Sequence, residues 1–209
     1  MKKIIVSGFE PFGGLTTNPT MEIIARINGW KVDNAEIHTI ILPVVYNDCA
    51  TRLIKYIDEL KPNIVISLGV ALGRSVITPE RIGVNIQDTV GEGYAGDNEG
   101  DKPQDRLIVE NGPDGIFSTL PNRRIIDKLQ EKGIPASISN TAGAYICNNT
   151  LYSVLHYIKE NNLSISAGFI HVPATPEMVT NKVNVPSMSI DLQEEAIRLA
   201  IEGCLEGAE

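Results

Sequence analysis

Apolar residues recur along this chain in two spacings: short continuous or alternating runs, and amphipathic stretches with a helical period. The runs predict β-strands, and the amphipathic stretches predict helices. The expected strands cover residues 2–8, 35–44, 63–70, 80–87, 134–139 and 164–173. The expected helices cover residues 19–29, 47–61, 122–133, a stretch from about 144 onward, and 191–206. Strands that alternate with helices are typical of an α/β fold, so we expect a three-layer α/β/α sandwich around a mostly parallel, mixed sheet.

The chain shows no internal division. Its 209 residues contain no repeat and no linker rich in Ser, Pro or Gly. This length lies within the reach of a single α/β domain, and 43% hydrophobic residues suffice for a sizeable core. We therefore predict one domain over residues 1–209.

The charge pattern excludes several classes of partner. The formal net charge is −8, and Lys and Arg gather only in short pairs such as Arg123 with Arg124. Such a chain offers no basic surface for nucleic acid or for an anionic membrane. The apolar run at residues 4–6 is too short for a signal sequence or a membrane span. These features predict a cytoplasmic protein.

The cysteines predict reduced thiols. There are three, Cys49, Cys147 and Cys204, and they are widely spaced without any Cys-x-x-Cys or Cys/His pattern. This arrangement argues against a disulfide framework and against a structural zinc site. Cys49 and Cys204 lie on helical patterns, and we interpret them as packing residues.

Loops that follow strands are the first place to look for chemistry, because the ligand crevice of such a sheet lies at the carboxyl ends of its strands. The loop GFEPFGG, residues 8–14, lacks the Lys and Ser/Thr of a phosphate-binding loop. It offers Phe9 and Phe12 instead, which either wall a small apolar pocket or belong to the core. A later Gly-rich loop is either a lid or a plain surface loop. Its glycines are Gly91, Gly93, Gly96 and Gly100.

Cys147, in the stretch ISNTAGAYICNN, admits two interpretations. Apolar residues follow it at helical spacing as far as Ile158, which is typical of a small residue on a buried helix face. However, SNTAG supplies turn formers between a strand and the helix, so Cys147 falls in the first helical turn. The helix dipole there favours a thiolate, and the N–H groups can hold an oxyanion. This position makes Cys147 a candidate nucleophile.

A thiol nucleophile needs a base, and the chain has three histidines. His38 lies within an expected strand, and His156 lies more than two helical turns beyond Cys147, out of side-chain reach. His171, in GFIHVP, lies at the carboxyl end of a strand, at the edge of the sheet where the crevice is expected. It is the best candidate for a general base.

A carboxylate that orients the imidazole is the third member of such a triad. Glu80 is the candidate, because in PERIGVNI it shares the parity of the alternating apolar residues in 82–86 and so points to their face. A carboxylate on an apolar face needs a partner. The neighbouring Arg81 points the other way. The partner is then His171, or Glu80 merely begins the strand at a wet edge.

Together these segments resemble the signature of the pyroglutamyl peptidase I family, also called pyrrolidone-carboxylate peptidases. The motifs occur in family order between residues 4 and 173: GFEPFGG, NP, GRSVITPERIGVN, DNEG, SNTAGAYICN and GFIHVP. The resemblance implies a cysteine peptidase that removes an amino-terminal pyroglutamyl residue from peptides. It also implies an α/β/α fold, no metal or cofactor, and a homo-oligomer, often a tetramer.

The resemblance also implies roles for single residues. Cys147 matches the family nucleophile, His171 its base and Glu80 its orienting acid. The implied substrate-binding residues are Phe9, Phe12, Asn18, Val70 and Arg74. Of these, Val70 stands where many members have Gln.

Two other functions stay open from the residues alone. A different cysteine hydrolase, acting on another small amide or ester, would keep the triad and change only the pocket. A nonenzymatic small-molecule binding protein would hold Cys147 as an unreactive core residue. The reactivity of Cys147 relative to Cys49 and Cys204 distinguishes an enzyme from a binding protein.

Overall fold

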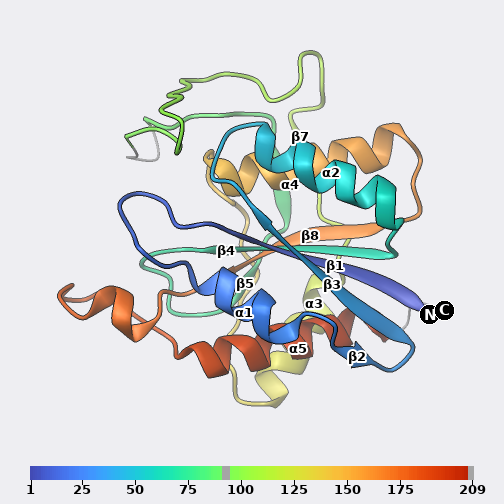
Figure 1. The fold of residues 1–209 in the computed structure, drawn as a ribbon, viewed down its shortest axis with the longest axis vertical. Helices are drawn as coiled ribbons and strands as arrows, with labels where there is room; N and C mark the ends of the chain where they lie inside the picture. The colour runs from blue at the N-terminus through green and yellow to red at the C-terminus, as the bar shows by residue number, and fades with distance from the viewer. Residues whose placement is uncertain (91–94, 207–209) are drawn as a thin grey trace.

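A central sheet forms the middle layer of the computed structural model (Figure 1), which describes residues 1–90 and 95–206. Within these residues the sheet has six strands. From edge to edge they are β2 (Lys31–Val32), β3 (Ala35–Leu42), β1 (Lys2–Phe9), β4 (Ile64–Val70), β8 (Ser166–Val172) and β5 (Thr78–Pro79). The inner strands run parallel, and the edge strands β2 and β5 run antiparallel to their neighbours. The mostly parallel, mixed sheet is confirmed.

Helices cover both faces of this sheet (Figure 1). One face carries α2 (Asp48–Leu60) and α4 (Ile146–Glu160), and the other carries α1 (Pro19–Ile27), α3 (Asn122–Glu131) and α5 (Ile190–Leu205). Each expected helix is present, with ends within two residues of the prediction. The three-layer sandwich follows because each amphipathic helix buries its apolar stripe against one face of the sheet.

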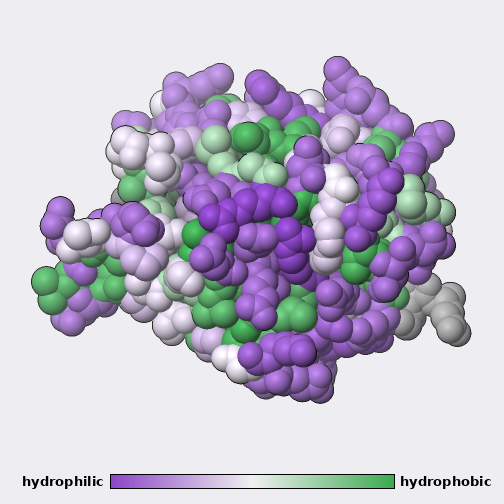
Figure 2. All heavy atoms as spheres, turned by 60° about the horizontal axis from the view of Figure 1, so that its bottom comes forward, coloured by the Kyte–Doolittle hydropathy of each residue, from purple (hydrophilic) through white to green (hydrophobic). Residues whose placement is uncertain are grey.

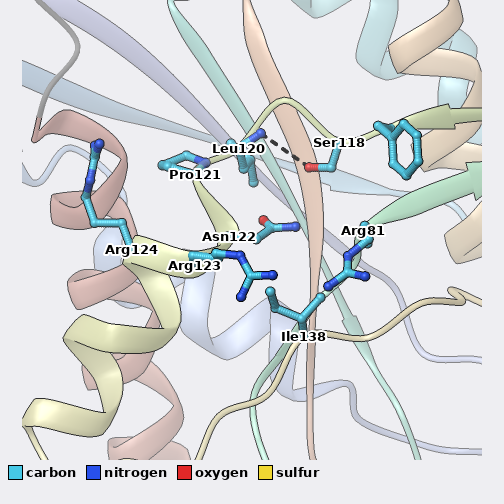
Figure 3. Close-up of a pocket in the computed structure, with 9 residues that line it drawn as sticks. Arg81, Ser118, Leu120, Pro121, Asn122, Arg123, Arg124 and Ile138 are labelled. Carbon is cyan, nitrogen blue, oxygen red and sulfur yellow. Dashed lines mark hydrogen bonds between the residues drawn. The ribbon is translucent and has the colours of Figure 1, made fainter.

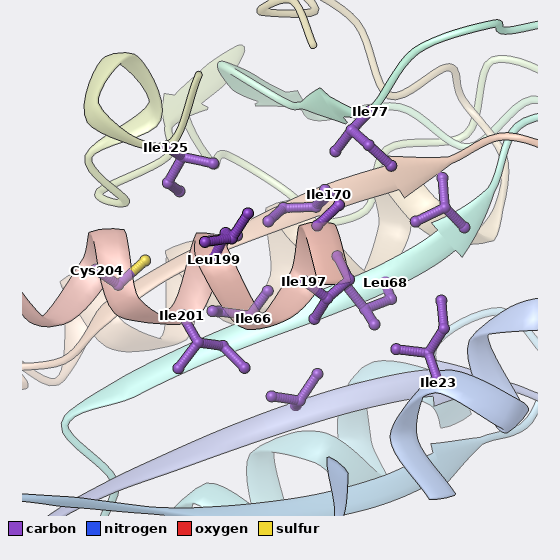
Figure 4. Close-up of a cluster of buried hydrophobic side chains, with 14 of the residues drawn as sticks. Ile23, Ile66, Leu68, Ile77, Ile125, Ile170, Ile197, Leu199, Ile201 and Cys204 are labelled. Carbon is purple, nitrogen blue, oxygen red and sulfur yellow. The ribbon is translucent and has the colours of Figure 1, made fainter. Parts of the chain in front are cut away.

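Side chains along β4 and β8 alternate between two hydrophobic cores. Leu68 and Ile170 point into the core under α1, α3 and α5, which Figure 4 shows. Phe169 points into the other core, under α2 and α4. Successive side chains of a strand point to opposite faces. Gly69 and His171 therefore share the face of Phe169, toward α2 and α4.

The prediction of a strand at residues 134–139 is wrong. The segment forms only isolated parallel bridges along β5, one of them between Glu80 and Ser139. Pro135 has no N–H to donate, and β5 is itself only two residues long, so a continuous ladder does not form.

The strand expected at residues 80–87 is shorter than predicted. It contributes only β6 (Ile82–Val84), which pairs with β7 (Gly115–Phe117) in a separate two-stranded sheet. The short strand β2 and the single-turn 3₁₀ helix at Pro176–Val179 were not expected.

Glu80 is buried, but not for the reason that its parity with residues 82–86 predicts. Ile82 and Val84, which share its parity, are only half-buried, whereas Asn85 and Gln87 of the opposite row are buried. These two polar side chains are buried because they hydrogen-bond the long loop that follows β6. Glu80 is buried because it lies at the end of β5, against β8.

The face formed by α1 and α5, at the bottom of Figure 1, is mostly hydrophilic, with apolar residues in small groups (Figure 2). The segment after β8, residues 173–189, drawn in orange in Figure 1, projects beside this face and carries Val183, which is 86% exposed. Over the described ranges, no helix has both the length and the apolar character needed to cross a membrane.

Candidate active site

His171 lies near the carboxyl end of β8, at the edge of the sheet where the crevice is expected. Its ring packs against the ring of Phe169, with 4.8 Å between centroids, and its side chain is 5% exposed. The Nδ1 atom lies 2.7 Å from Oε1 of Glu80. Burial and this contact fix the plane of the imidazole, as the orienting carboxylate of a catalytic triad does.

Glu80 is fully buried beside β8, where Thr78 of β5 pairs in register with His171. Burial alone would raise the pKa of this carboxyl group. The hydrogen bond and charge of His171, together with the charge of Arg74, outweigh burial and lower the pKa below its ordinary value. Glu80 is therefore a carboxylate, which only accepts hydrogen bonds. We accordingly assign the proton of the neutral imidazole to Nδ1, so that Nε2 exchanges protons with a nucleophile.

Arg74 also binds Glu80, a contact that the sequence did not predict. Its Nη1 atom donates to Oε1 of Glu80 and to Oγ1 of Thr78, each at 2.6 Å. Its Nη2 atom donates to the carbonyl of Thr141 at 3.0 Å. The resemblance implied that Arg74 binds substrate, whereas here its guanidinium is directed at the orienting carboxylate.

Cys147 is the second residue of α4, in the first helical turn as expected. The two asparagines that follow hold this turn from two sides. Asn148 exchanges hydrogen bonds with the backbone of Val84 in β6, and Asn149 accepts one from the backbone N–H of Asn47 beside α2. The N-cap residue of α4, Tyr145, makes no cap hydrogen bond with its own side chain. A helix start of this kind can stabilise an oxyanion.

Gly69 brings the thiol and the imidazole together. It pairs in register with His171, and in-register residues of neighbouring strands point to the same face. The thiol occupies the space that a side chain at Gly69 would fill, because an ideal Cβ there would lie 2.9 Å from Sγ of Cys147. Cys147 and His171 also line one cleft of about 310 Å³. The role of Gly69 could not be predicted from the sequence, because it depends on α4, a helix far along the chain.

A narrow apolar slot opens from this cleft beside Cys147. Phe9, Phe12 and Tyr145 line the slot, whose free volume is about 20 Å³. Tyr145 packs against Phe12 with 6.2 Å between ring centroids, and its hydroxyl donates to the carbonyl of Gly96 at 3.0 Å. The slot thus presents apolar walls beside the thiol, next to the larger cleft. Tyr145 was not predicted to line the slot, although its place two residues before Cys147 could have indicated it.

Val70 and Asn18 lie at the slot as well. Val70 ends β4 and lines both the slot and the cleft. Asn18 is the N-cap of α1: its Oδ1 accepts from the backbone N–H of Thr20 at 3.1 Å and from the hydroxyl of Thr20 at 2.9 Å. Its Nδ2 donates to the carbonyl of Glu10 at 3.2 Å. These bonds hold the aromatic loop against α1.

The DNEG part of the Gly-rich loop is fastened to the aromatic loop. Asn98 donates to Oε1 of Glu10 at 2.8 Å and to the carbonyl of Pro11 at 3.0 Å. These bonds argue against a lid that swings at this segment. Gly91 and Gly93, the first glycines of the candidate lid, lie outside the described residues.

The other cysteines and histidines lie away from the cleft. Cys49 and Cys204 are buried in the two hydrophobic cores, and Figure 4 shows Cys204. Burial raises the pKa of each of these thiols to about 12. His38 lies in β3, and His156 stacks on the ring of Tyr152 in α4.

A second hollow, of about 570 Å³, lies elsewhere on the surface (Figure 3). Arg81 and Arg123 extend toward one another across it. The described residues that line it include no thiol, histidine or carboxylate, so this hollow supplies no base that could activate the hydroxyl of Ser118. The cleft at Cys147 is therefore the candidate active site.

Comparisons with known proteins identify the family of this chain. Residues 2–207 match the family model described as pyroglutamyl peptidase. The pyrrolidone-carboxylate peptidase of Pyrococcus furiosus is 44% identical over 208 residues, 98% of each chain. That of Enterobacter sp. (strain 638) is 41% identical over 201 residues, 96% of this chain and 92% of the relative. The crystal structure of pyroglutamyl peptidase I from Bacillus amyloliquefaciens superposes with a TM-score of 0.94 at 36% identity, covering 98% of this chain and 95% of that chain. The chain belongs to the pyroglutamyl peptidase family.

Proposed function

We propose that this protein is a cysteine peptidase that removes an amino-terminal pyroglutamyl residue from peptides. Membership of the family supports the activity. The observation that carries the proposal is the place of the Cys147 thiol, in the space above Gly69 and on the face of His171. The carboxylate of Glu80 holds that imidazole by its Nδ1 atom.

The proposed reaction passes through a thioester. The Cys147 thiolate attacks the pyroglutamyl carbonyl carbon, and the start of α4 stabilises the oxyanion that forms. The amide C–N bond breaks as the His171 imidazolium gives its proton to the leaving amine. A water molecule then loses a proton to His171 and attacks the thioester, which releases pyroglutamate and restores the thiol. Glu80 stabilises the imidazolium through both steps.

The apolar walls of the slot beside Cys147 suit the pyroglutamyl ring, which also needs the space of the adjoining cleft. Pyroglutamate is a neutral lactam without a free amine, so its pocket needs apolar walls and a few hydrogen bonds rather than a carboxylate for an ammonium group. Phe9, Phe12 and Tyr145 supply such walls. A prolyl residue has a ring of similar size but carries an ammonium group, which is costly to bury in an apolar slot.

A substrate series tests the activity. The measurement is release of a fluorescent amine from pyroglutamyl, prolyl and alanyl amides. We expect kcat/KM for the pyroglutamyl amide to exceed that for either control by about a thousandfold or more, because only the lactam enters the slot without an ammonium group. If no amide is cleaved while Cys147 still alkylates rapidly, the alternative is a cysteine hydrolase of a different small amide or ester. If Cys147 is also inert, the protein is a binding protein.

We also propose that the enzyme is a homo-oligomer, a tetramer by its resemblance to the family. Phe117 and Val183 are 65% and 86% exposed, and they are apolar side chains that a second copy can cover. Sedimentation equilibrium is expected to give four times the 22.7 kDa mass of the chain. A mass of one chain at all concentrations would contradict the proposal.

We propose a cytoplasmic location. The proposed nucleophile is a thiol, and no disulfide bond joins Cys49, Cys147 and Cys204, which all lie within the described residues. A reducing compartment keeps such thiols in the form that the attack requires.

A further inference from the structure

Arg74 lies between the orienting carboxylate and the segment that leads to the nucleophile. Its Nη1 atom donates to Glu80, and its Nη2 atom donates to the carbonyl of Thr141, in the turn before Cys147. We propose that Arg74 is a positioning residue for the reaction: it holds the Glu80–His171 pair in place against the turn that carries Cys147. This inference rests on the proposed function and gives Arg74 a role other than substrate binding.

Two residues that Arg74 binds, Glu80 and Thr78, are themselves paired with His171. Oε1 of Glu80 accepts both from Nδ1 of His171, at 2.7 Å, and from Nη1 of Arg74, at 2.6 Å. The same Nη1 atom donates to the hydroxyl of Thr78, whose backbone pairs with His171 between β5 and β8. A planar guanidinium holds its acceptors in a fixed geometry. Loss of this group would leave the carboxylate free to turn, and the imidazole with it.

The charge of Arg74 has a second effect on the cleft. The ionisable groups around the imidazole are Arg74, Glu80, Cys147 and Tyr145. A fixed positive charge disfavours proton binding at each of the others. Removing that charge would move proton binding in the whole cleft to higher pH, whichever group determines each limb of the pH–rate profile.

A substrate-binding role for Arg74 makes a different prediction. The pyroglutamyl ring is neutral and offers no charge for a guanidinium to pair with. An arginine that binds substrate equally in the ground and transition states raises KM when it is lost, whereas one that positions the base lowers kcat. The division of the effect between kcat and KM therefore separates the two roles.

The test uses Arg74→Met and Arg74→Lys in the full-length protein, assayed with a pyroglutamyl amide across pH. In Arg74→Met, kcat is expected to fall about tenfold or more with little change in KM. The acid limb of its pH–rate profile is expected to move to higher pH, by about half a pH unit or more. Arg74→Lys keeps the positive charge, so its pH–rate profile is expected to lie at the same pH as that of wild type. It recovers only part of kcat, because an ammonium group lacks the planar fork that reaches Glu80, Thr78 and Thr141 together.

Arg81→Met is the matched control. It removes the same charge from the residue next to Glu80, but Arg81 lines the second hollow (Figure 3). Its profile is expected to match wild type. A raised KM with unchanged kcat and profile in Arg74→Met, or an equal shift in Arg81→Met, would overturn the inference.

A readout without substrate separates this inference from the proposed function. The rate at which iodoacetamide alkylates Cys147 is measured against pH in wild type and in Arg74→Met. The same shift to higher pH is expected there even if the pyroglutamyl amide proves not to be the substrate. An unshifted alkylation profile in a folded Arg74→Met protein would contradict the role of the Arg74 charge.

Discussion

Replacing Cys147 with alanine is expected to lower kcat/KM for a pyroglutamyl amide by about four orders of magnitude or more. In the proposed mechanism the thiol forms the thioester, and neither of the other two thiols can take its place. Cys49 and Cys204 are buried in the cores, and burial raises the pKa of each to about 12, so both stay protonated at neutral pH. Release of the fluorescent amine, measured at high enzyme concentration, gives the residual rate.

Cys204→Ala is the control for this substitution. It removes a thiol of the same size from the core under α5 and is expected to leave kcat/KM unchanged. Brief treatment of the native protein with iodoacetamide should modify one thiol in wild type and in Cys204→Ala, and none in Cys147→Ala. Activity that survives in Cys147→Ala would exclude the thioester mechanism.

The nucleophile and the base could be proposed from sequence because their placement follows local rules. Cys147 comes after a turn and inside the first turn of α4, and His171 lies at the end of a continuous buried strand. The carboxyl ends of parallel strands meet at one edge of the sheet, so two such residues are brought to the same crevice by topology alone. The alternation of β8 then fixes the face of His171.

Glu80 was proposed for a reason that the structure does not support. The parity of residues 80–87 assumes one straight strand, but the chain leaves β5 after Pro79 and forms β6 in a different sheet. Which row of residues 80–87 is buried depends on the loop that Asn85 and Gln87 hydrogen-bond, and that loop has no periodicity to indicate it. Long-range hydrogen bonds, rather than hydrophobic pattern, decide the burial of this segment.

The contact of Arg74 with Glu80 and the space at Gly69 could not be predicted for a related reason. The space at Gly69 depends on β4, β8 and the start of α4, which meet only in the folded chain. Arg74 and Glu80 are only six residues apart, but their contact depends on how the chain turns between β4 and β5, and that turn has no periodicity to indicate it. The sequence therefore indicates which residues are candidates for the chemistry, and the packing of these segments determines how far apart these residues lie.

Replacing Gly69 with alanine is expected to have the second largest effect, a fall in kcat/KM of about a hundredfold. The new Cβ would lie 2.8 Å from Cε1 and Cζ of Phe169 and 2.9 Å from Sγ of Cys147. Phe169 is fully buried between strand and helix and cannot move easily. The thiol lies at the end of a short side chain, so it is the group that turns away, and the attack geometry is lost.

Two glycine variants serve as controls for Gly69→Ala. At Gly168, in β8, a Cβ would overlap Oγ of Ser118 and would lie 2.7 Å from Cδ1 of Leu120, on the face away from the thiol. Gly168→Ala is therefore expected to cost stability, about 1–3 kcal/mol, but to keep kcat/KM per folded molecule. At Gly203, in α5, the nearest atom would lie at 3.6 Å, so Gly203→Ala is expected to raise stability by about 0.5–1 kcal/mol.

Three measurements on these variants locate the effect. Urea unfolding gives the stability, the pyroglutamyl amide gives kcat/KM, and iodoacetamide gives the reactivity of Cys147. Gly69→Ala should lose both activity and rapid alkylation while still folded, because its added methyl group moves the thiol away from His171. If Gly168→Ala loses as much activity per folded molecule, or if Gly69→Ala loses none, then the position of the thiol above Gly69 does not determine the rate. If only Gly69→Ala is impaired, a missing side chain on β4 is what lets a helix cysteine reach a strand histidine.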